Sequence, residues 1–184
     1  CHMSPNVLSA TRTGAIPGVA ARHLARKDSE VCAVVGCGPI NKSCFRHIVT
    51  QAPKLKKAIC YDIFPEKAQA FADWAKEECG IEALAMSDLP GALKDADMVS
   101  VAASRLKPLH IESKWIKKGA LVMLSGPANG DEAFWTGSKI VYDNIKLHEA
   151  YVEEACASPD KAAYYASVIG GPIYTLIDAG KLKG

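Results

Sequence analysis

The stretch from Val31 to Ser43 constrains the fold of this chain more than any other. An uncharged, valine-rich run, Val31–Val35, ends at the turn Gly36-Cys37-Gly38, and an amphipathic segment follows it. This order predicts a buried parallel strand, a tight turn and a helix whose first N–H groups face an anion. Asn41 stands where the usual G-x-G-x-x-G pattern has its third glycine, which predicts slightly looser packing of the helix on the strand. Our working hypothesis is a site for the pyrophosphate of a dinucleotide.

Short apolar segments alternate with segments of helical spacing along most of the chain. The predicted strands cover residues 31–35, 57–62, 81–86, 97–102, 120–124 and 139–143. Helices are predicted over 40–52 and over 65–79 with Gly80 as C-cap, a short helix or turn over 87–94, and a short helix over 111–118. The alternation predicts an α/β fold, a Rossmann-type doubly wound parallel sheet of about six strands flanked by helices.

One helix is expected before this sheet and two after it. The first covers 13–26 and is expected to begin properly at Ile16, because Pro17 is tolerated in a first turn. The last two cover 145–156 and 161–178. We interpret residues 1–184 as one NAD(P)-binding Rossmann domain, with 1–3 a cloning remnant, and expect it to be a fragment of a larger two-domain protein.

Composition and charge argue against several classes of protein. The net charge is +2 with both signs interleaved, so no basic stripe indicates a nucleic-acid partner. The apolar runs are far shorter than the roughly 20 residues of a membrane span. Seven cysteines, an odd number, show neither a C-x-x-C motif nor zinc-type spacing, which predicts reduced thiols in a cytoplasmic protein without a metal site.

Asp62 strengthens the nucleotide hypothesis. It closes the predicted second strand, 21 residues after Asn41, where a carboxylate can accept hydrogen bonds from the adenosine ribose. A carboxylate there also repels a 2′-phosphate, so we expect NAD rather than NADP. The alternative is that Asp62 caps the helix that begins at Pro65, and both roles are compatible.

Small residues follow the fourth and fifth predicted strands, at the edge where open α/β sheets bind ligands. Ala102, Ala103 and Ser104 come after one strand and Ser125 after the other, and they leave room for a nicotinamide ring. Ordinary loop composition is the alternative explanation. Cys37 would lie near a bound phosphate, either as a reactive thiol or simply as a small side chain that fits.

Three motifs together resemble the ornithine cyclodeaminase/μ-crystallin family. They are the segment from Ser9 to Ala15, which contains Arg12-Thr13, the loop Gly36-Cys37-Gly38-Pro39-Ile40-Asn41, and Tyr61-Asp62. The resemblance spans nearly the whole chain but covers only the family's nucleotide domain. It implies that Arg12 binds the substrate's α-carboxylate, that the loop from Gly36 to Ile40 binds the pyrophosphate, and that Asp62 binds the ribose.

The resemblance implies an NAD-dependent enzyme that acts on an amino acid or a cyclic imine by hydride transfer, with an amino-acid-like substrate and a dimeric full-length protein. The family's catalytic aspartate follows the fifth strand, where this chain has Pro127, and Asp131 four residues later is the candidate. Ile40 replaces the family's usual glutamine. A non-catalytic, μ-crystallin-like binding protein and an amino-acid or opine dehydrogenase are the alternatives, and the 184 residues alone are expected to be inactive.

Overall fold

The computed structural model describes residues 2, 5–103 and 109–157. The chain divides into two compact units, one of residues 1–104 and 114–125 and the other of residues 105–113 and 126–184. The helix predicted over 161–178 lies outside the described residues. Within the described ranges, no helix combines the length and hydropathy that crossing a membrane requires.

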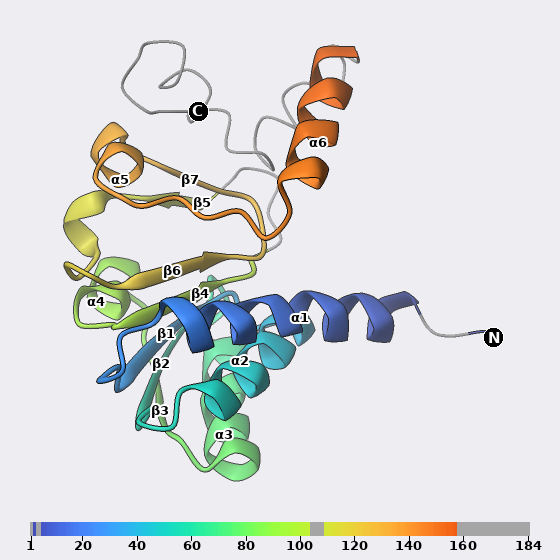
Figure 1. Cartoon of the computed structure of the whole chain (residues 1–184). Coiled ribbons are helices and arrows are strands. Elements are labelled where there is room, and N and C mark those ends of the chain that lie inside the picture. The colour runs from blue at the N-terminus through green and yellow to red at the C-terminus, as the bar shows by residue number, and fades with distance from the viewer. Residues whose placement is uncertain (1, 3–4, 104–108, 158–184) are drawn as a thin grey trace. The chain divides into compact units, whose positions relative to one another are not determined.

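A parallel sheet of five strands in the order β3-β2-β1-β4-β6 forms the first unit (Figure 1). The strands are β1 (Val31–Val35), β2 (Lys57–Tyr61), β3 (Glu82–Ala85), β4 (Met98–Val101) and β6 (Leu121–Leu124). Five of the six predicted strands are therefore confirmed, as is the Rossmann-type α/β fold. The strand order reverses between β1 and β4, which is the point where doubly wound sheets bind ligands at their carboxyl edge.

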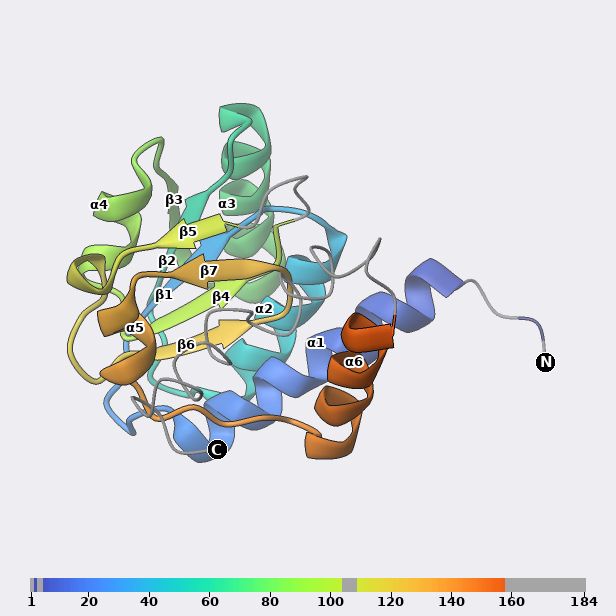
Figure 2. The same cartoon turned by 90° about the horizontal axis from the view of Figure 1, so that it is seen from above.

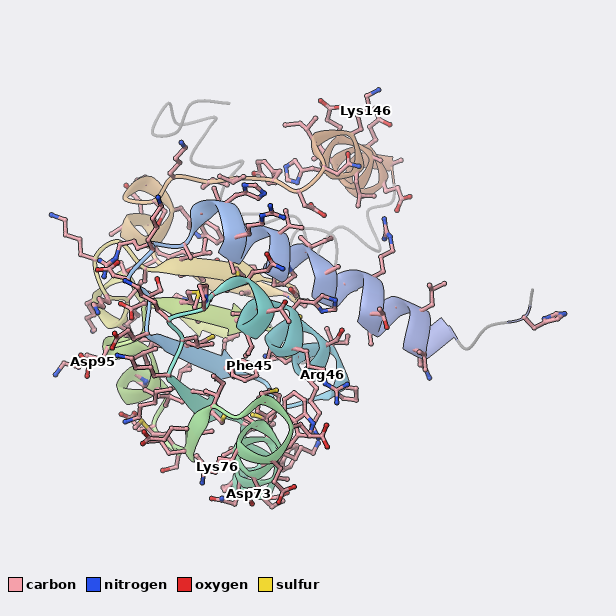
Figure 3. All side chains as sticks on the ribbon, turned by 60° about the horizontal axis from the view of Figure 1, so that its bottom comes forward. Phe45, Arg46, Asp73, Lys76, Asp95 and Lys146 are labelled. Carbon is pink, nitrogen blue, oxygen red and sulfur yellow. The ribbon has the colours of Figure 1, made fainter. Side chains whose placement is uncertain are left out.

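Three helices cover one face of this sheet: α1 (Pro5–Leu24), α2 (Pro39–Gln51) and α3 (Pro65–Cys79). Figure 3 shows Phe45 of α2 inside the unit and Arg46 pointing outward. Phe45 packs edge-on against Phe71 of α3, with ring centroids 5.8 Å apart. The short helix α4 (Leu89–Lys94) buries Leu93 outside this cluster, and its N-cap is Asp88.

Helix α1 differs from the prediction, because it begins at Pro5 and carries Pro17 in its interior. Its buried face follows the helical step of three and four residues: Gly14, Pro17, Gly18 and Ala21. Helix α1 lies beside α2 in both views (Figures 1 and 2), and the two glycines of this face contact α2. Packing against α2 stabilises the helix and outweighs the cost of an internal proline.

The second unit contains a parallel pair of strands, β5 (Leu109–Ile111) and β7 (Ala128–Gly130). Helix α5 (Glu132–Thr136) follows β7, and α6 (Ile145–Ala157) confirms the helix predicted over 145–156. The strand predicted over 139–143 is wrong: this segment pairs with no strand of the described chain, and Val141 is 55% exposed. The helix predicted over 111–118 is also wrong, because β5 and the single 3-10 turn η1 (Ser113–Trp115) lie there.

Candidate functional site

The glycine loop begins where β1 ends, and its first residue must be glycine. Gly36 has a φ of +85°, and its N–H donates to the carbonyl oxygen of Tyr61 at 2.9 Å. A Cβ atom at Gly36 would lie 2.8 Å from the carbonyl oxygen of Ala102 and from the Cα of Ala103. The loop and the end of β4 therefore lie in direct backbone contact.

Gly38 meets a different condition, because the space beside it is open. Its backbone is extended (φ −89°, ψ −180°), and no atom of the described chain lies within 4 Å of a Cβ built there. Gly38 is the N-cap of α2, and the first helical bond runs from the Lys42 N–H to the Gly38 carbonyl oxygen at 3.0 Å. Among the described residues, the N–H groups of Ile40 and Asn41 have no partner within the helix, so they can bind an anion.

Asp62 joins the end of β2 to the loop. One carboxylate oxygen accepts the Cys37 N–H at 2.7 Å, and the other accepts the N–H of Phe64, the N-cap of α3, at 3.1 Å. The carboxylate is half-buried and each oxygen keeps a further lone pair. Asp62 can therefore hold the loop and still accept hydrogen bonds from a ribose.

Asn41, in the third-glycine position, does not loosen the packing as predicted. Its side chain is fully buried, and Nδ2 lies 3.0 Å from the carbonyl oxygen of Val35, 2.8 Å from that of Gly36 and 3.2 Å from that of Ser100. Oδ1 accepts a hydrogen bond from the Ser100 hydroxyl at 2.6 Å. The amide thus fills the gap between α2 and the strands with hydrogen bonds.

Cys37 lies in the loop as a buried small side chain. Its Sγ donates toward the carbonyl oxygen of Tyr61 at 3.5 Å. Burial, followed by the proximity of Cys60 and Asp62, raises the pKa of the Cys37 thiol far above its ordinary value. The thiol is therefore protonated at neutral pH, which supports the small-residue interpretation over the reactive one.

The small residues after β4 and β6 extend the two strands by one hydrogen bond each. The Ala102 N–H donates to the Val35 carbonyl oxygen at 3.0 Å, and the Ser125 N–H to that of Val101 at 2.8 Å. Ala102 and Ala103 thereby lie beside Gly36 at the carboxyl edge. The Ser125 hydroxyl lies 3.9 Å from the Cys44 sulfur, and Ser104 is outside the described residues.

Arg12 lies on α1, which runs parallel to α2. A Cβ at Gly14 would lie 2.7 Å from the Ser43 carbonyl carbon, and one at Gly18 would lie 2.7 Å from the Cβ of His47. Arg12 precedes Gly14 by two residues, or about 3 Å of helix rise, so it lies near the level of the loop along the helix axis. Its side chain is exposed and points away from α2, so the structure does not bring it into contact with the loop.

Asp131 lies in the second unit, where it caps α5. Its carboxylate accepts the Phe134 N–H at 2.8 Å, the Ser113 N–H at 3.1 Å and the Ser113 hydroxyl at 2.9 Å. Burial alone would raise the pKa of Asp131, but these hydrogen bonds outweigh it and hold the pKa below its usual value. Within the described ranges, no three His, Cys, Asp or Glu side chains gather as metal ligands would.

Comparison with known proteins identifies the same family that the sequence motifs resemble. Residues 2–158 match the model of the Ornithine cyclodeaminase/mu-crystallin family. The N-((2S)-2-amino-2-carboxyethyl)-L-glutamate dehydrogenase of Staphylococcus aureus is 28% identical over 144 residues, which are 77% of this chain and 43% of that protein.

Two solved structures are similar in fold and sequence. The Thermococcus litoralis Delta(1)-pyrroline-2-carboxylate reductase in complex with NADH and L-proline has a TM-score of 0.67 at 28% identity, covering 76% of this chain and 44% of that one. The iminosuccinate reductase of Paracoccus denitrificans in complex with NAD+ has a TM-score of 0.68 at 25% identity, covering 77% and 44%. The chain spans less than half the length of each of these three proteins.

Proposed function

Because the chain belongs to the Ornithine cyclodeaminase/mu-crystallin family, we propose that it supplies the NAD(H)-binding part of a reductase or dehydrogenase for an amino acid or its imine. When bound, the dinucleotide accepts or gives the hydride of such a reaction. One observation carries the proposal: the loop is held by Asp62 at 2.7 Å while the space beside Gly38 stays open. A phosphate fits that space, and a side chain would fill it.

The residues around the loop suit the parts of a dinucleotide. We propose that the first turn of α2 binds the pyrophosphate and that Asp62 binds the adenosine ribose. Ile63 and Phe64, which follow Asp62, are 53% and 47% exposed and present an apolar surface to an adenine ring. A nicotinamide would lie near Ala102 and Ala103. That Arg12 binds the carboxylate of the substrate stays a prediction, because its exposed side chain points away from α2.

The role of Asp62 also leads us to propose NAD rather than NADP. Its two oxygens are held by backbone N–H groups, so the carboxylate is fixed at the ribose position. A 2′-phosphate there would face this carboxylate, and no arginine follows Asp62 directly to bind the phosphate.

A titration calorimetry experiment with NADH and NADPH tests the proposal. We expect the 184-residue chain to bind NADH more tightly than NADPH. Gly38→Ala should weaken NADH binding about tenfold or more, equivalent to about 1.4 kcal/mol, because the new Cβ occupies the open space. The stability cost should be about 1 kcal/mol or less, because alanine is a weaker N-cap.

Gly80→Ala is the matched control. Gly80 also has open space around a built Cβ, but it caps the far end of α3 with a φ of +66°. This variant should lose stability and keep its NADH affinity. Binding of neither nucleotide, or a preference for NADPH, would contradict the proposal.

The capping bonds of Asp131 favour a second candidate, a protein that binds a nucleotide and a small ligand without turnover. A carboxylate that accepts three hydrogen bonds and has a lowered pKa is a poor proton donor. Asp131 stays a prediction as the catalytic acid. Amino-acid-dependent reduction of NAD+ that survives in an Asp131→Asn variant of the full-length protein would exclude that role and the non-catalytic candidate together.

A further inference from the structure

Asn41 and Ser100 form a polar pair inside the first unit, between α2 and β4. Both residues are 0% exposed, although they lie 59 positions apart in the sequence. Burying an amide and a hydroxyl is costly unless every polar atom has a partner. The hydrogen bonds of the two side chains supply these partners.

The Ser100 hydroxyl determines which way the amide of Asn41 is turned. It donates to Oδ1 at 2.6 Å, and this leaves Nδ2 facing three carbonyl oxygens, which can only accept. The flipped amide would place an oxygen against three other oxygens. One orientation is therefore strongly favoured.

The amide in this orientation controls the backbone of the loop. Nδ2 lies within hydrogen-bond distance of the carbonyl oxygens of Val35 and Gly36, the last residue of β1 and the first of the turn. Both carbonyl oxygens thus have a partner inside the protein, and that of Val35 also accepts the Ala102 N–H at 3.0 Å. The backbone N–H groups of Ile40 and Asn41, which have no partner within the helix, are left for the ligand.

We infer that Asn41 is a positioning residue for the pyrophosphate of the dinucleotide and that Ser100 acts through it. The usual third glycine lets the helix approach the strand closely, whereas this chain holds helix, turn and strand together with one buried amide. The inference rests on the proposed function, because it concerns the same site.

Two substitutions test it in the 184-residue chain. Asn41→Ala removes all the bonds of the amide, whereas Ser100→Ala removes the one that orients it, together with the hydroxyl's contact with the Cys44 thiol. We expect the NADH dissociation constant to rise about tenfold or more for Asn41→Ala and about threefold for Ser100→Ala, in the range for a buried hydrogen bond. The double variant should match Asn41→Ala, because we infer that the Ser100 hydroxyl acts on the loop through the Asn41 amide.

Two further measurements separate positioning from a general loss of structure. Adenosine, which has no phosphate, should bind the variants within about twofold of wild type in an NMR titration, because Asp62 is untouched. Ile48→Val, at a buried residue of α2 two turns further on, should lower stability by about 1 kcal/mol and leave NADH affinity unchanged. If Asn41→Ala does not fold, Ser100→Ala carries the test.

The inference is overturned if wild type binds NADH and the folded variants bind it within twofold of wild type. It is also overturned if adenosine and NADH lose affinity equally. If wild type does not bind NADH, the proposed function fails, and the inference fails with it.

Discussion

Asp97 holds three segments together at the amino-terminal edge of the sheet. Its side chain is 6% exposed, and one carboxylate oxygen accepts the N–H groups of Glu30 and Val31 at 2.9 and 3.1 Å. The other accepts from Lys117 Nζ at 2.7 Å and lies 3.4 Å from Arg26. Burial alone would raise the pKa of Asp97, but these hydrogen bonds and charges outweigh it, so the pKa is lowered.

A lowered pKa makes the contribution of Asp97 to stability depend on pH. The carboxylate stabilises the fold above its unfolded-state pKa of about 3.9, and this stabilisation is lost as the pH falls through the lower folded-state value. Asp97→Asn should therefore cost about 1–3 kcal/mol at pH 7, and its difference from wild type should shrink as the pH falls below about 4. Urea denaturation at several pH values measures both effects.

Asp95→Asn is the control for this prediction. Asp95 lies two residues earlier and is exposed, with its side chain at the surface in Figure 3. Its substitution should change the free energy of unfolding by about 0.5 kcal/mol or less. A constant gap between wild type and Asp97→Asn from pH 7 to pH 3 would show that the charge of Asp97 is not what stabilises the edge.

At the scale of elements, the contact between α1 and α2 depends on two glycines. Gly14 and Gly18 face Ser43 and His47: a Cβ at Gly14 would lie 2.7 Å from the Ser43 carbonyl carbon, and one at Gly18 would lie 2.7 Å from the His47 Cβ. Alanine would gain about 1 kcal/mol of helix propensity at each position. At Gly14 the obstacle includes the backbone of Ser43, which cannot rotate away, so we expect the steric cost to be larger than this gain.

Gly14→Ala should therefore lower the free energy of unfolding by about 1–3 kcal/mol, as overpacking does in other tightly packed contacts. Val19→Ala, at a residue of the same helix that is 60% exposed, should be close to neutral. Chemical denaturation compares the two variants. A Gly14→Ala protein that is as stable as wild type would show that the helices can separate at little cost.

Most elements of the sheet could be predicted because each is local. Val31–Val35 is a continuous apolar run, and Pro65 and Gly80 mark the two ends of α3. The segment 139–143 has the same kind of residues as a strand but remains exposed, since strand formation needs a partner that the sequence does not name. The three-residue strands β5 and β7 are too short to give a pattern, and they pair with each other across 16 intervening residues.

The candidate site also contains residues that could be predicted from local sequence and residues that could not. Gly36, Gly38 and Asp62 follow a known spacing and could be found from the sequence. The role of Asn41 could not, because Ser100 comes from another strand and no spacing rule links the two. Pro17 misled the prediction of α1 for a related reason: the packing that compensates for it comes from α2.

At the scale of the whole molecule, α1 presents an apolar surface opposite its contact with α2. Leu8, Ile16 and Val19 share this outward face with Arg12, and their exposed fractions are 51%, 39% and 60%. Apolar side chains gathered on one face favour association with another surface. The predicted dimer stays a prediction, and this face is where we expect it to form.

Sedimentation velocity over a range of concentrations measures this association. We expect wild type to move from monomer toward dimer as the concentration rises, and Val19→Lys to shift that transition to higher concentration, because a charge would have to be buried. Val141→Lys, at an exposed residue of the second unit, is the control. Equal behaviour of Val19→Lys and wild type would exclude this face of α1.

The two glycines of α1 also decide how the chain can move. Gly14 and Gly18 repeat at the same four-residue step as Ser43 and His47, so a slip by one turn would keep at most one of the two close contacts. We therefore expect helices α1 and α2 to move as one rigid body. The backbone of Arg12 should then keep a fixed distance from the glycine loop. If a substrate pocket opens and closes during a catalytic cycle, that motion has to come from other segments, while α1 and the glycine loop keep their relative position.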